Sequence, residues 1–261
     1  LNALRGVSKE AGYEVALYRD PPGSNTVVAQ IQYVKPGSPA VAAGLKRGDL
    51  ISMINGLQIT IDNYKVLLGS LDKPHSLTYK ALDVANRTFG ELQTVQLTPV
   101  EYSENPNFFH TILTYDDHKI GYYVYNLFAT GPASGNEAYT NEQDQIFNYF
   151  KTEGITDLII DLRFNSGGSE TATTNLASLI GKNVNNTKIF SKRNYNSLLT
   201  TEIKRDPSLG EDFLRVMFKN KEQNVGNLLR GSRVFILTGS RTASASELLI
   251  NGLRPFMDVF L

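Results

Sequence analysis

The chain has 261 residues, of which 41% are hydrophobic, and its 26 basic residues balance 26 acidic ones. This length exceeds one average domain and the apolar content is enough for packed cores, whereas the balanced charge gives no reason to expect nucleic acid or an anionic membrane surface as a partner. Cysteine is absent, which excludes disulfides, a thiol nucleophile and thiolate zinc sites, and the three scattered histidines have no metal-ligand spacing, so we expect no metal and no other cofactor.

The N-terminal part of the chain predicts a small β-rich domain. Residues 30–34 alternate between polar and apolar side chains, as a half-buried strand does. Proline- and glycine-rich turns then flank a short helical stretch, and Asn55 with Gly56 favours a tight turn because both residues accept a positive φ. The order P-G-S-P-A-x-x-A-G-L-x-x-G-D-x-I-x-x-I-N-G, which begins at Pro36, resembles PDZ domains, especially the permuted bacterial kind.

A PDZ domain binds the C-terminal tail of a partner as an added strand, and backbone amides capture the tail carboxylate. The resemblance implies that the capturing loop comprises Gly12, Tyr13, Glu14 and Val15, ahead of a strand over residues 15–18. This loop departs from the usual G-L-G-F pattern, and Glu14 would place a negative charge close to the incoming carboxylate. Two alternatives stay open: the domain binds tails, or it only packs against the rest of the protein.

Proline, asparagine and aspartate interrupt the apolar patterns between residues 100 and 118. We therefore place a domain boundary in this stretch. The PDZ-like domain then covers residues 1–102, and a second domain covers residues 103–261.

The second domain alternates between strands and helices. A strand is predicted over residues 119–125, a helix from about residue 141, a strand that ends at Asp161 and a further helix that stops at Gly181. Such alternation indicates a largely parallel α/β core. The polar stretch that follows is less informative; its apolar residues around Val216 predict a packed hairpin, with a lid as the alternative.

One serine stands between a buried strand and a helix. The apolar run Val234–Thr238 precedes the sequence T-A-S-A-S-E, whose third residue is Ser244, and a helical pattern of leucines follows. Hydrolases place nucleophiles at such positions, because the first N–H groups of a helix have no partner inside it and can stabilise negative charge on a substrate oxygen. The alternative is a capping box, S-x-x-E, in which Ser244 accepts from the amide three residues on and Glu247 reaches back.

A second loop leaves an apolar strand in the same way. It has the sequence D-L-R-F-N-S-G-G and runs from Asp161 to Gly168 into another helical pattern. Its glycine pair is either a turn that merely starts a helix or a piece of backbone that approaches a substrate carbonyl closely. We expect Arg163 and Asn165 to brace this loop rather than to take part in chemistry.

The two motifs D-L-R-x-N-x-G-G and T-A-S-A-S-E, in this order, resemble the C-terminal processing (tail-specific) serine peptidases. The resemblance covers most of the chain from about Lys119 onward, apart from a variable stretch over residues 183–230. The run from Ser246 to Pro255 is similar to members from Bacteroidetes. The resemblance implies an α/β fold class in which a PDZ-like β-rich domain is followed by a Clp/crotonase-like α/β serine peptidase core.

The resemblance also implies roles for the site residues. Ser244 is the nucleophile, the amides of Gly168 and Ala245 form the oxyanion hole, and Gly167 is a close second to Gly168. The base of this family is a lysine that desolvation keeps neutral, in a G-K motif one strand and one turn after the serine helix. No lysine follows Ser244 in this sequence, so we expect a fragment, inactive by itself, whose catalytic lysine lies beyond Leu261.

Histidine is the obvious competitor as a base, because its side chain titrates near neutral pH. The chain has His75 in the first domain, and His110 and His118 near the domain junction. We expect all three to be exposed or structural rather than to serve Ser244.

These observations predict a serine endopeptidase that cleaves polypeptides by acyl transfer and whose PDZ domain engages substrate tails. The resemblance implies polypeptide partners and a periplasmic or cell-envelope location. One alternative is a non-catalytic protein that binds peptide tails and carries a degenerate protease-like domain. Another is an acyl-transfer enzyme on the related Clp and crotonase scaffold that acts on thioesters.

No apolar run approaches the roughly 20 residues that cross a bilayer.

Overall fold

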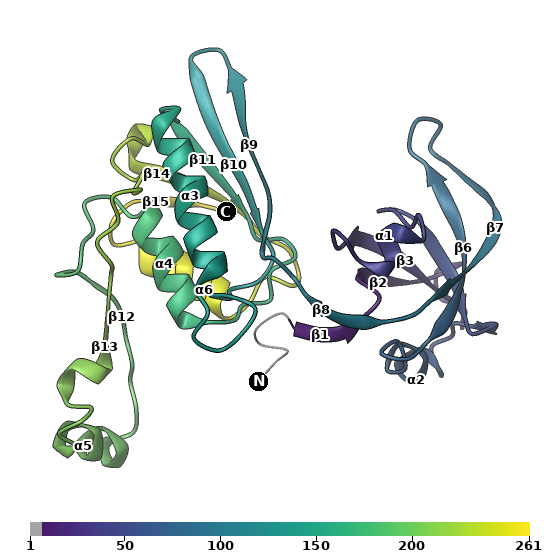
Figure 1. Ribbon diagram of the computed structural model, residues 1–261, viewed down its shortest axis with the longest axis horizontal. Coiled ribbons are helices and arrows are strands. Elements are labelled where there is room, and N and C mark those ends of the chain that lie inside the picture. The colour runs from purple at the N-terminus through teal and green to yellow at the C-terminus, as the bar shows by residue number, and fades with distance from the viewer. Residues whose placement is uncertain (1–6) are drawn as a thin grey trace. The chain divides into compact units, whose positions relative to one another are not determined.

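The computed structural model describes residues 7–261 and contains two compact units (Figure 1). The N-terminal unit comprises Val7–Glu104, and the C-terminal unit comprises Asn105–Leu261. The division lies two residues beyond the boundary that the sequence suggests. Each unit has its own cluster of buried apolar side chains.

The N-terminal unit consists of strands and two short helices. Its main sheet has the strand order β2-β3-β4-β6-β7, β5 pairs with β4, and β1 pairs separately with β8; all of these pairs are antiparallel. The elements are β1 (Val7–Glu10), β2 (Tyr13–Arg19), β3 (Val27–Val34), α1 (Pro39–Ala42), β4 (Leu50–Ile54), β5 (Leu57–Gln58), α2 (Tyr64–Leu68), β6 (His75–Asp83), β7 (Thr88–Leu97) and β8 (Val100–Ser103).

Local sequence explains several of these elements. Alternate side chains are buried along the whole of β3, so the half-buried strand that the sequence predicts is present and longer than predicted. Ser38 caps α1 by accepting a backbone hydrogen bond, and Pro39 suits the first helical position, where no donor is needed. Asn55 and Gly56 have φ 53° and 74°, which confirms the tight turn between β4 and β5.

The C-terminal unit is built on a five-stranded sheet with the order β15-β14-β11-β10-β9. Only β9 and β10 are antiparallel; β10, β11, β14 and β15 run parallel, which confirms the α/β class. The elements are β9 (Asn107–Tyr115), β10 (His118–Tyr125), α3 (Ala138–Thr152), β11 (Asp157–Asp161), α4 (Glu170–Ile180), β12 (Ile189–Lys192), α5 (Ser197–Arg205), η2 (Glu211–Leu214), β13 (Arg215–Met217), η3 (Arg230–Ser232), β14 (Arg233–Leu237), α6 (Ala245–Leu253) and β15 (Asp258–Phe260).

The helices α3, α4 and α6 pack on the sheet, and their apolar side chains share one core with those of the strands. The helix expected from about residue 141 begins earlier, at Ala138, because Asn136 Oδ1 accepts from the Ala138 amide at 2.8 Å. The strand β11 ends at Asp161, as the sequence predicts. The stretch around Val216 packs against the core, as predicted, but it is the single strand β13 rather than a local hairpin. It pairs antiparallel with the distant β12, and Figure 1 shows α5 at the far end of the excursion between these two strands.

Asp157 connects three strands of this sheet where β11 begins. Its carboxylate accepts from His118 Nδ1 at 2.6 Å and from Arg233 Nη2 at 3.1 Å, and the Thr156 hydroxyl donates to it at 2.9 Å. Burial raises the pKa of the Asp157 carboxyl, but the hydrogen bonds from His118, Thr156 and Arg233 outweigh burial and hold this pKa below its ordinary value.

This contact makes the stability of the protein depend on pH. A carboxyl whose pKa is lowered by folding stabilises the fold above its unfolded-state pKa of about 4, and this contribution is lost as the pH falls through the lower, folded-state pKa. We expect Asp157→Asn to lower the free energy of unfolding at pH 7 by on the order of 1 kcal/mol, because the half-buried donors His118 and Arg233 lose a charged partner. Between about pH 5 and pH 3, the free energy of unfolding of the variant should fall less steeply than that of the wild type.

Urea unfolding followed by circular dichroism across this pH range measures both effects. Asp116→Asn, at an exposed turn, is the matched control and should follow the wild type. If the free energy of unfolding changes with pH equally in the wild type and in Asp157→Asn, the Asp157 carboxylate does not have this stabilising role.

Candidate active site

Ser244 lies at the start of α6, where the chain has left β14. It is exposed, and its backbone has φ 55° and ψ −113°, a conformation that costs on the order of 1–3 kcal/mol for a residue with a side chain. An ordinary helix cap has extended backbone instead. The Ser244 amide donates to Glu247 Oε2 at 2.7 Å, so Glu247 reaches back as it does in a capping box. The capping box expected as the alternative is therefore present, with Ser244 and Glu247 as its two members. A capping box does not require the strained backbone and the exposure of Ser244.

Ser246 has the opposite surroundings. It is fully buried, and its hydroxyl donates to the backbone oxygen and to Oδ1 of Asn165, both at 3.2 Å. Asn165 is also fully buried, and its Nδ2 donates to the Tyr125 carbonyl at 2.9 Å. Asn165 thus connects α6 with the glycine-containing loop and with the end of β10, which is the bracing role expected from the sequence.

That loop passes directly beside Ser244. Gly167 and Gly168 have φ 111° and 134°, a region that side chains disfavour. A Cβ on Gly167 would lie 2.7 Å from Ser244 Cβ and 3.0 Å from Ala245 N, and a Cβ on Gly168 would lie 2.3 Å from Phe128 O. Neither position has room for a side chain. The structure therefore brings together the two motifs that the sequence singles out.

The amides of the two loops differ in their partners. Gly167 N donates to Asn165 Oδ1 at 2.8 Å, so this amide is occupied. The amides of Gly168 and Ala245 donate to no atom within residues 7–261. Two unpartnered N–H groups beside an exposed serine are what an oxyanion hole requires. The geometry therefore suits Gly168 and Ala245 for that role and gives Gly167 the role of close packing.

Asp161 and Arg163 brace the start of the same loop. Arg163 Nε donates to both carboxylate oxygens of Asp161 at 3.0 Å, and the Tyr122 hydroxyl donates to Asp161 Oδ2 at 2.6 Å. Burial raises the pKa of Asp161, and these bonds more than offset it, so the pKa lies below its ordinary value. The Thr242 hydroxyl donates to the Leu162 carbonyl at 2.7 Å and so attaches the serine loop to this one.

None of the three histidines contacts Ser244 in the described part of the chain. His75 is buried in the N-terminal unit, where its ring nitrogens bond Tyr13 OH at 3.1 Å and Lys73 O at 2.7 Å. His110 packs edge-on against aromatic rings of α3, and His118 bonds Asp157 at the beginning of β11. Because β11 and β14 are parallel, that beginning is the edge of the sheet opposite Ser244.

The residues expected to capture a tail carboxylate lie at the start of an outer strand. Tyr13, Glu14 and Val15 already belong to β2, which begins two residues earlier than predicted because its pairing with β3 continues through an irregularity between Glu14 and Val15. Gly12 has φ 85°, and its carbonyl accepts from Lys35 N at 2.9 Å. The strand β2 pairs with β3 and with no other strand of the described residues.

Lys35 lies beside these residues among three carboxylates. Its side chain is 7% exposed, and Nζ lies 2.8 Å from Glu10, 3.0 Å from Glu104 and 3.4 Å from Glu14. Burial lowers the pKa of Lys35, but the three glutamates outweigh burial and raise it above its ordinary value. No short sequence motif could reveal this group, because its members come from four separate parts of the N-terminal unit.

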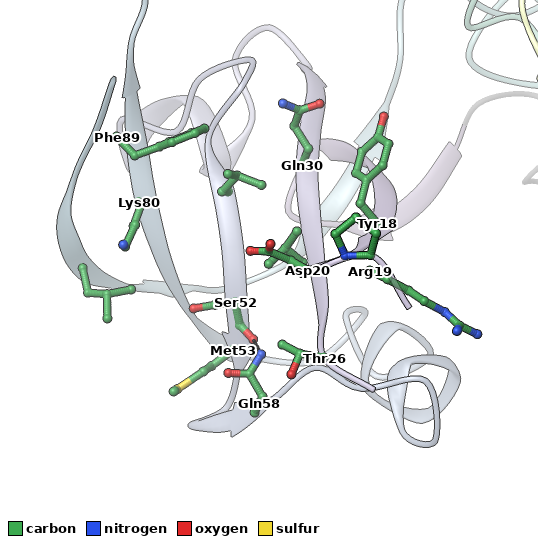
Figure 2. Close-up of a pocket in the computed structure, with 14 residues that line it drawn as sticks. Tyr18, Arg19, Asp20, Thr26, Gln30, Ser52, Met53, Gln58, Lys80 and Phe89 are labelled. Atoms are coloured by element: carbon green, nitrogen blue, oxygen red, sulfur yellow. Dashed lines mark hydrogen bonds between the residues drawn. The ribbon is translucent and has the colours of Figure 1, made fainter. Parts of the chain in front are cut away.

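Two hollows flank the β-sheet of this unit. One, of about 410 Å³, runs along β2 and the start of α2, and Leu17, Val27, Ile61 and Tyr64 line it among others. The other, of about 940 Å³, lies on the open face of the sheet, and Figure 2 shows its lining side chains, such as Gln30, coming from neighbouring strands. None of the site residues expected from the sequence lines either hollow.

Within residues 7–261 no group of histidine, aspartate and glutamate side chains has the arrangement of a metal site. Over the same residues, no helix has the length and apolar character needed to cross a membrane.

Comparison with known proteins agrees with this architecture. The sequence model of peptidase family S41 matches residues 119–255, and that of a PDZ domain matches residues 30–80. The chain is similar to the chloroplastic C-terminal processing peptidase of Tetradesmus obliquus, with 27% identity over 151 residues, which are 56% of this chain and 32% of that protein. It also resembles the solved structure of an S41 protease from Bacteroides fragilis, with 26% identity and a TM-score of 0.72, covering 97% of this chain and 62% of that one.

The chain thus spans less than two thirds of the length of either relative. The family match covers more than half of the chain and includes both motifs that meet at Ser244. The chain belongs to peptidase family S41, with a PDZ domain ahead of the peptidase domain.

Proposed function

We propose that the protein is a serine endopeptidase that cleaves polypeptides by acyl transfer. The observation that carries this proposal is the exposed Ser244 beside the unpartnered amides of Gly168 and Ala245. The Ser244 hydroxyl attacks the scissile carbonyl and gives its proton to a base, while the carbonyl oxygen becomes an oxyanion held by the two amides. The C–N bond then breaks as the base returns the proton to the leaving amine, and water releases the acyl group.

The rigidity of the two loops supports this role for both amides. Asn165 and the close contact of Gly167 with Ser244 fix the two loops against each other, so little reorganisation is needed when negative charge develops. One such donor typically accelerates the reaction about 100- to 1000-fold in serine proteases.

For the base we propose a neutral lysine, as the family resemblance implies, supplied by residues outside these 261. A serine hydroxyl stays protonated near pH 7 and is a weak nucleophile without such a group. In support, no histidine or lysine side chain within residues 7–261 hydrogen-bonds to Ser244. Lys182 bonds Ser232 just before β14, at the opposite edge of the sheet from Ser244.

The first test compares the two serines of the motif. In the protein that includes the catalytic lysine, Ser244→Ala should lower kcat/KM for a fluorogenic peptide by at least about a thousandfold. Ser246→Ala removes a buried hydrogen bond, so it should lower the free energy of unfolding by about 1 kcal/mol and leave most of the activity. Equal losses of activity in the two variants would refute the assignment of Ser244.

The second test concerns the 261-residue chain by itself. General-base assistance contributes about a hundred- to ten-thousandfold in rate, so this chain should turn over the same peptide that much more slowly than a chain extended through a G-K motif. A serine-directed fluorophosphonate probe should label the extended chain at Ser244 and the short one hardly at all. If both chains turn over the substrate equally fast, the base lies within the 261 residues and the Ser-Lys mechanism is wrong.

We further propose that the N-terminal unit binds substrate tails as a strand added to β2. This strand lies at the edge of its sheet, and the hollow of about 410 Å³ beside it has apolar walls for alternate side chains of a tail. Glu14 would oppose the tail carboxylate, and Lys35 at 3.4 Å only partly neutralises it because Lys35 also pairs with two other glutamates. Backbone amides must then supply most of the attraction.

Peptide binding to the whole chain tests this proposal. A peptide with a free C-terminal carboxylate should bind about ten- to a hundredfold more tightly than its amidated twin, because charge-assisted bonds to amides contribute about 1.5–3 kcal/mol. Glu14→Gln should tighten binding of the free-carboxylate peptide, whereas the exposed Glu91→Gln, on β7, should not. Fluorescence anisotropy measures both. Equal affinities for the two peptides would leave the N-terminal unit only a packing role.

A further inference from the structure

The excursion between β12 and β13 begins at the same edge of the sheet as the proposed active site. The helices α4 and α6 follow the parallel neighbours β11 and β14, so both helices start at the carboxyl edge of these strands. Glu170 is the first residue of α4, two positions after Gly168. Arg193, which directly follows β12, pairs through Nη2 with the Glu170 carboxylate. The base of the excursion therefore lies next to the loop that carries Gly168.

Arg193 also connects the two ends of the excursion. Its amide donates to Leu214 O at 2.9 Å, its Nη1 donates to Phe213 O at 2.8 Å, and its guanidinium lies 4.8 Å from the centre of the Phe213 ring. The Tyr195 ring stacks on the Phe213 ring, and the two ring centroids lie 6.5 Å apart. The two ends of the excursion are thus held together beside Glu170, and they enclose a shaped hollow.

This hollow, of about 280 Å³, has an excess of positive charge. Four cationic side chains line it, and the carboxylate of Glu211 is the one anionic group among its lining residues. The four are Lys192, Arg193, Lys204 and Arg215. Glu211 is shared, at 3.2 Å from Lys204 and 3.7 Å from Arg215, and Lys192 has no ion-pair partner within residues 7–261.

We propose that this hollow is a subsite for a carboxylate of the polypeptide substrate. The inference rests on the proposed function, since the hollow adjoins the edge at which Ser244 and Gly168 lie. A cation without an ion-pair partner in a partly enclosed hollow attracts a carboxylate, and Lys192 is free to pair with it. The carboxylate comes either from an acidic side chain of the substrate or from its C-terminus, and the two sources share one recognition chemistry.

The experiment measures binding rather than turnover, in the whole chain with Ser244→Ala. Four fluorescein-labelled unstructured peptides differ only in an internal Glu or Gln pair and in a free or amidated C-terminus. If the proposal holds, removing the carboxylate that is recognised weakens binding about three- to fivefold, the range for partly exposed ion pairs, and added salt reduces the difference. The internal pair and the C-terminus are varied separately, so the change that weakens binding identifies which carboxylate of the substrate is recognised.

Lys192→Gln tests the location. It should remove the three- to fivefold discrimination that this hollow contributes, and Lys192→Gln with Arg215→Gln should do so at every salt concentration, while the exposed Lys188→Gln, four residues upstream, should preserve it. A preference for the free C-terminus that β2 contributes is unchanged by these variants. Melting curves check that each variant is folded. The proposal is overturned if the four peptides bind equally or not at all, if Lys192→Gln leaves every discrimination between carboxylate and amide at its original size, or if Lys188→Gln reduces it equally. Because the Ser244→Ala chain has no nucleophile, failure here is distinct from failure of the peptidase assignment.

Discussion

The close approach of Gly167 to Ser244 is the constraint on which the rest of the site depends. A Cβ at Gly167 would lie 2.7 Å from Ser244 Cβ, so the two loops can meet only where one of them has no side chain. Their meeting places the amides of Gly168 and Ala245 beside an exposed hydroxyl. Asn165, buried between the loops, then bonds the Gly167 amide and the Ser246 hydroxyl, so that two separate helix starts become one rigid site.

The parallel sheet makes this approach possible. β11 and β14 are neighbours, with Ile160 opposite Ile236, and the loops that leave them must therefore start at the same edge. At the other edge the Asp157 carboxylate bonds His118 and Arg233 and so connects the beginnings of three strands. The unfavourable backbone at Ser244 lies where the contacts of Gly167 and Asn165 hold the two loops together.

Much of the fold could be predicted from sequence neighbours. The alternation in β3, the turn at Asn55 and the end of β11 at Asp161 each depend on side chains or dihedral angles a few residues apart, and all three are present. The start of α3 lies three residues before the predicted one, where the Asn136 side chain accepts from the Ala138 amide. The cluster around Lys35 and the cationic hollow at Lys192 could not be predicted, since their members are scattered along the chain.

The sequence by itself determined that Ser244 and Gly168 each stand between a strand and a helix, because strand and helix patterns are local. It also determined the order of the two motifs, on which the family resemblance rests. Only the tertiary structure decided that Ser244 is exposed while Ser246 is buried, and that the Gly167 amide is occupied while that of Gly168 is not. The physical reason is that burial and hydrogen-bond partners depend on atoms that the pairing of β11 with β14 brings together from distant parts of the chain.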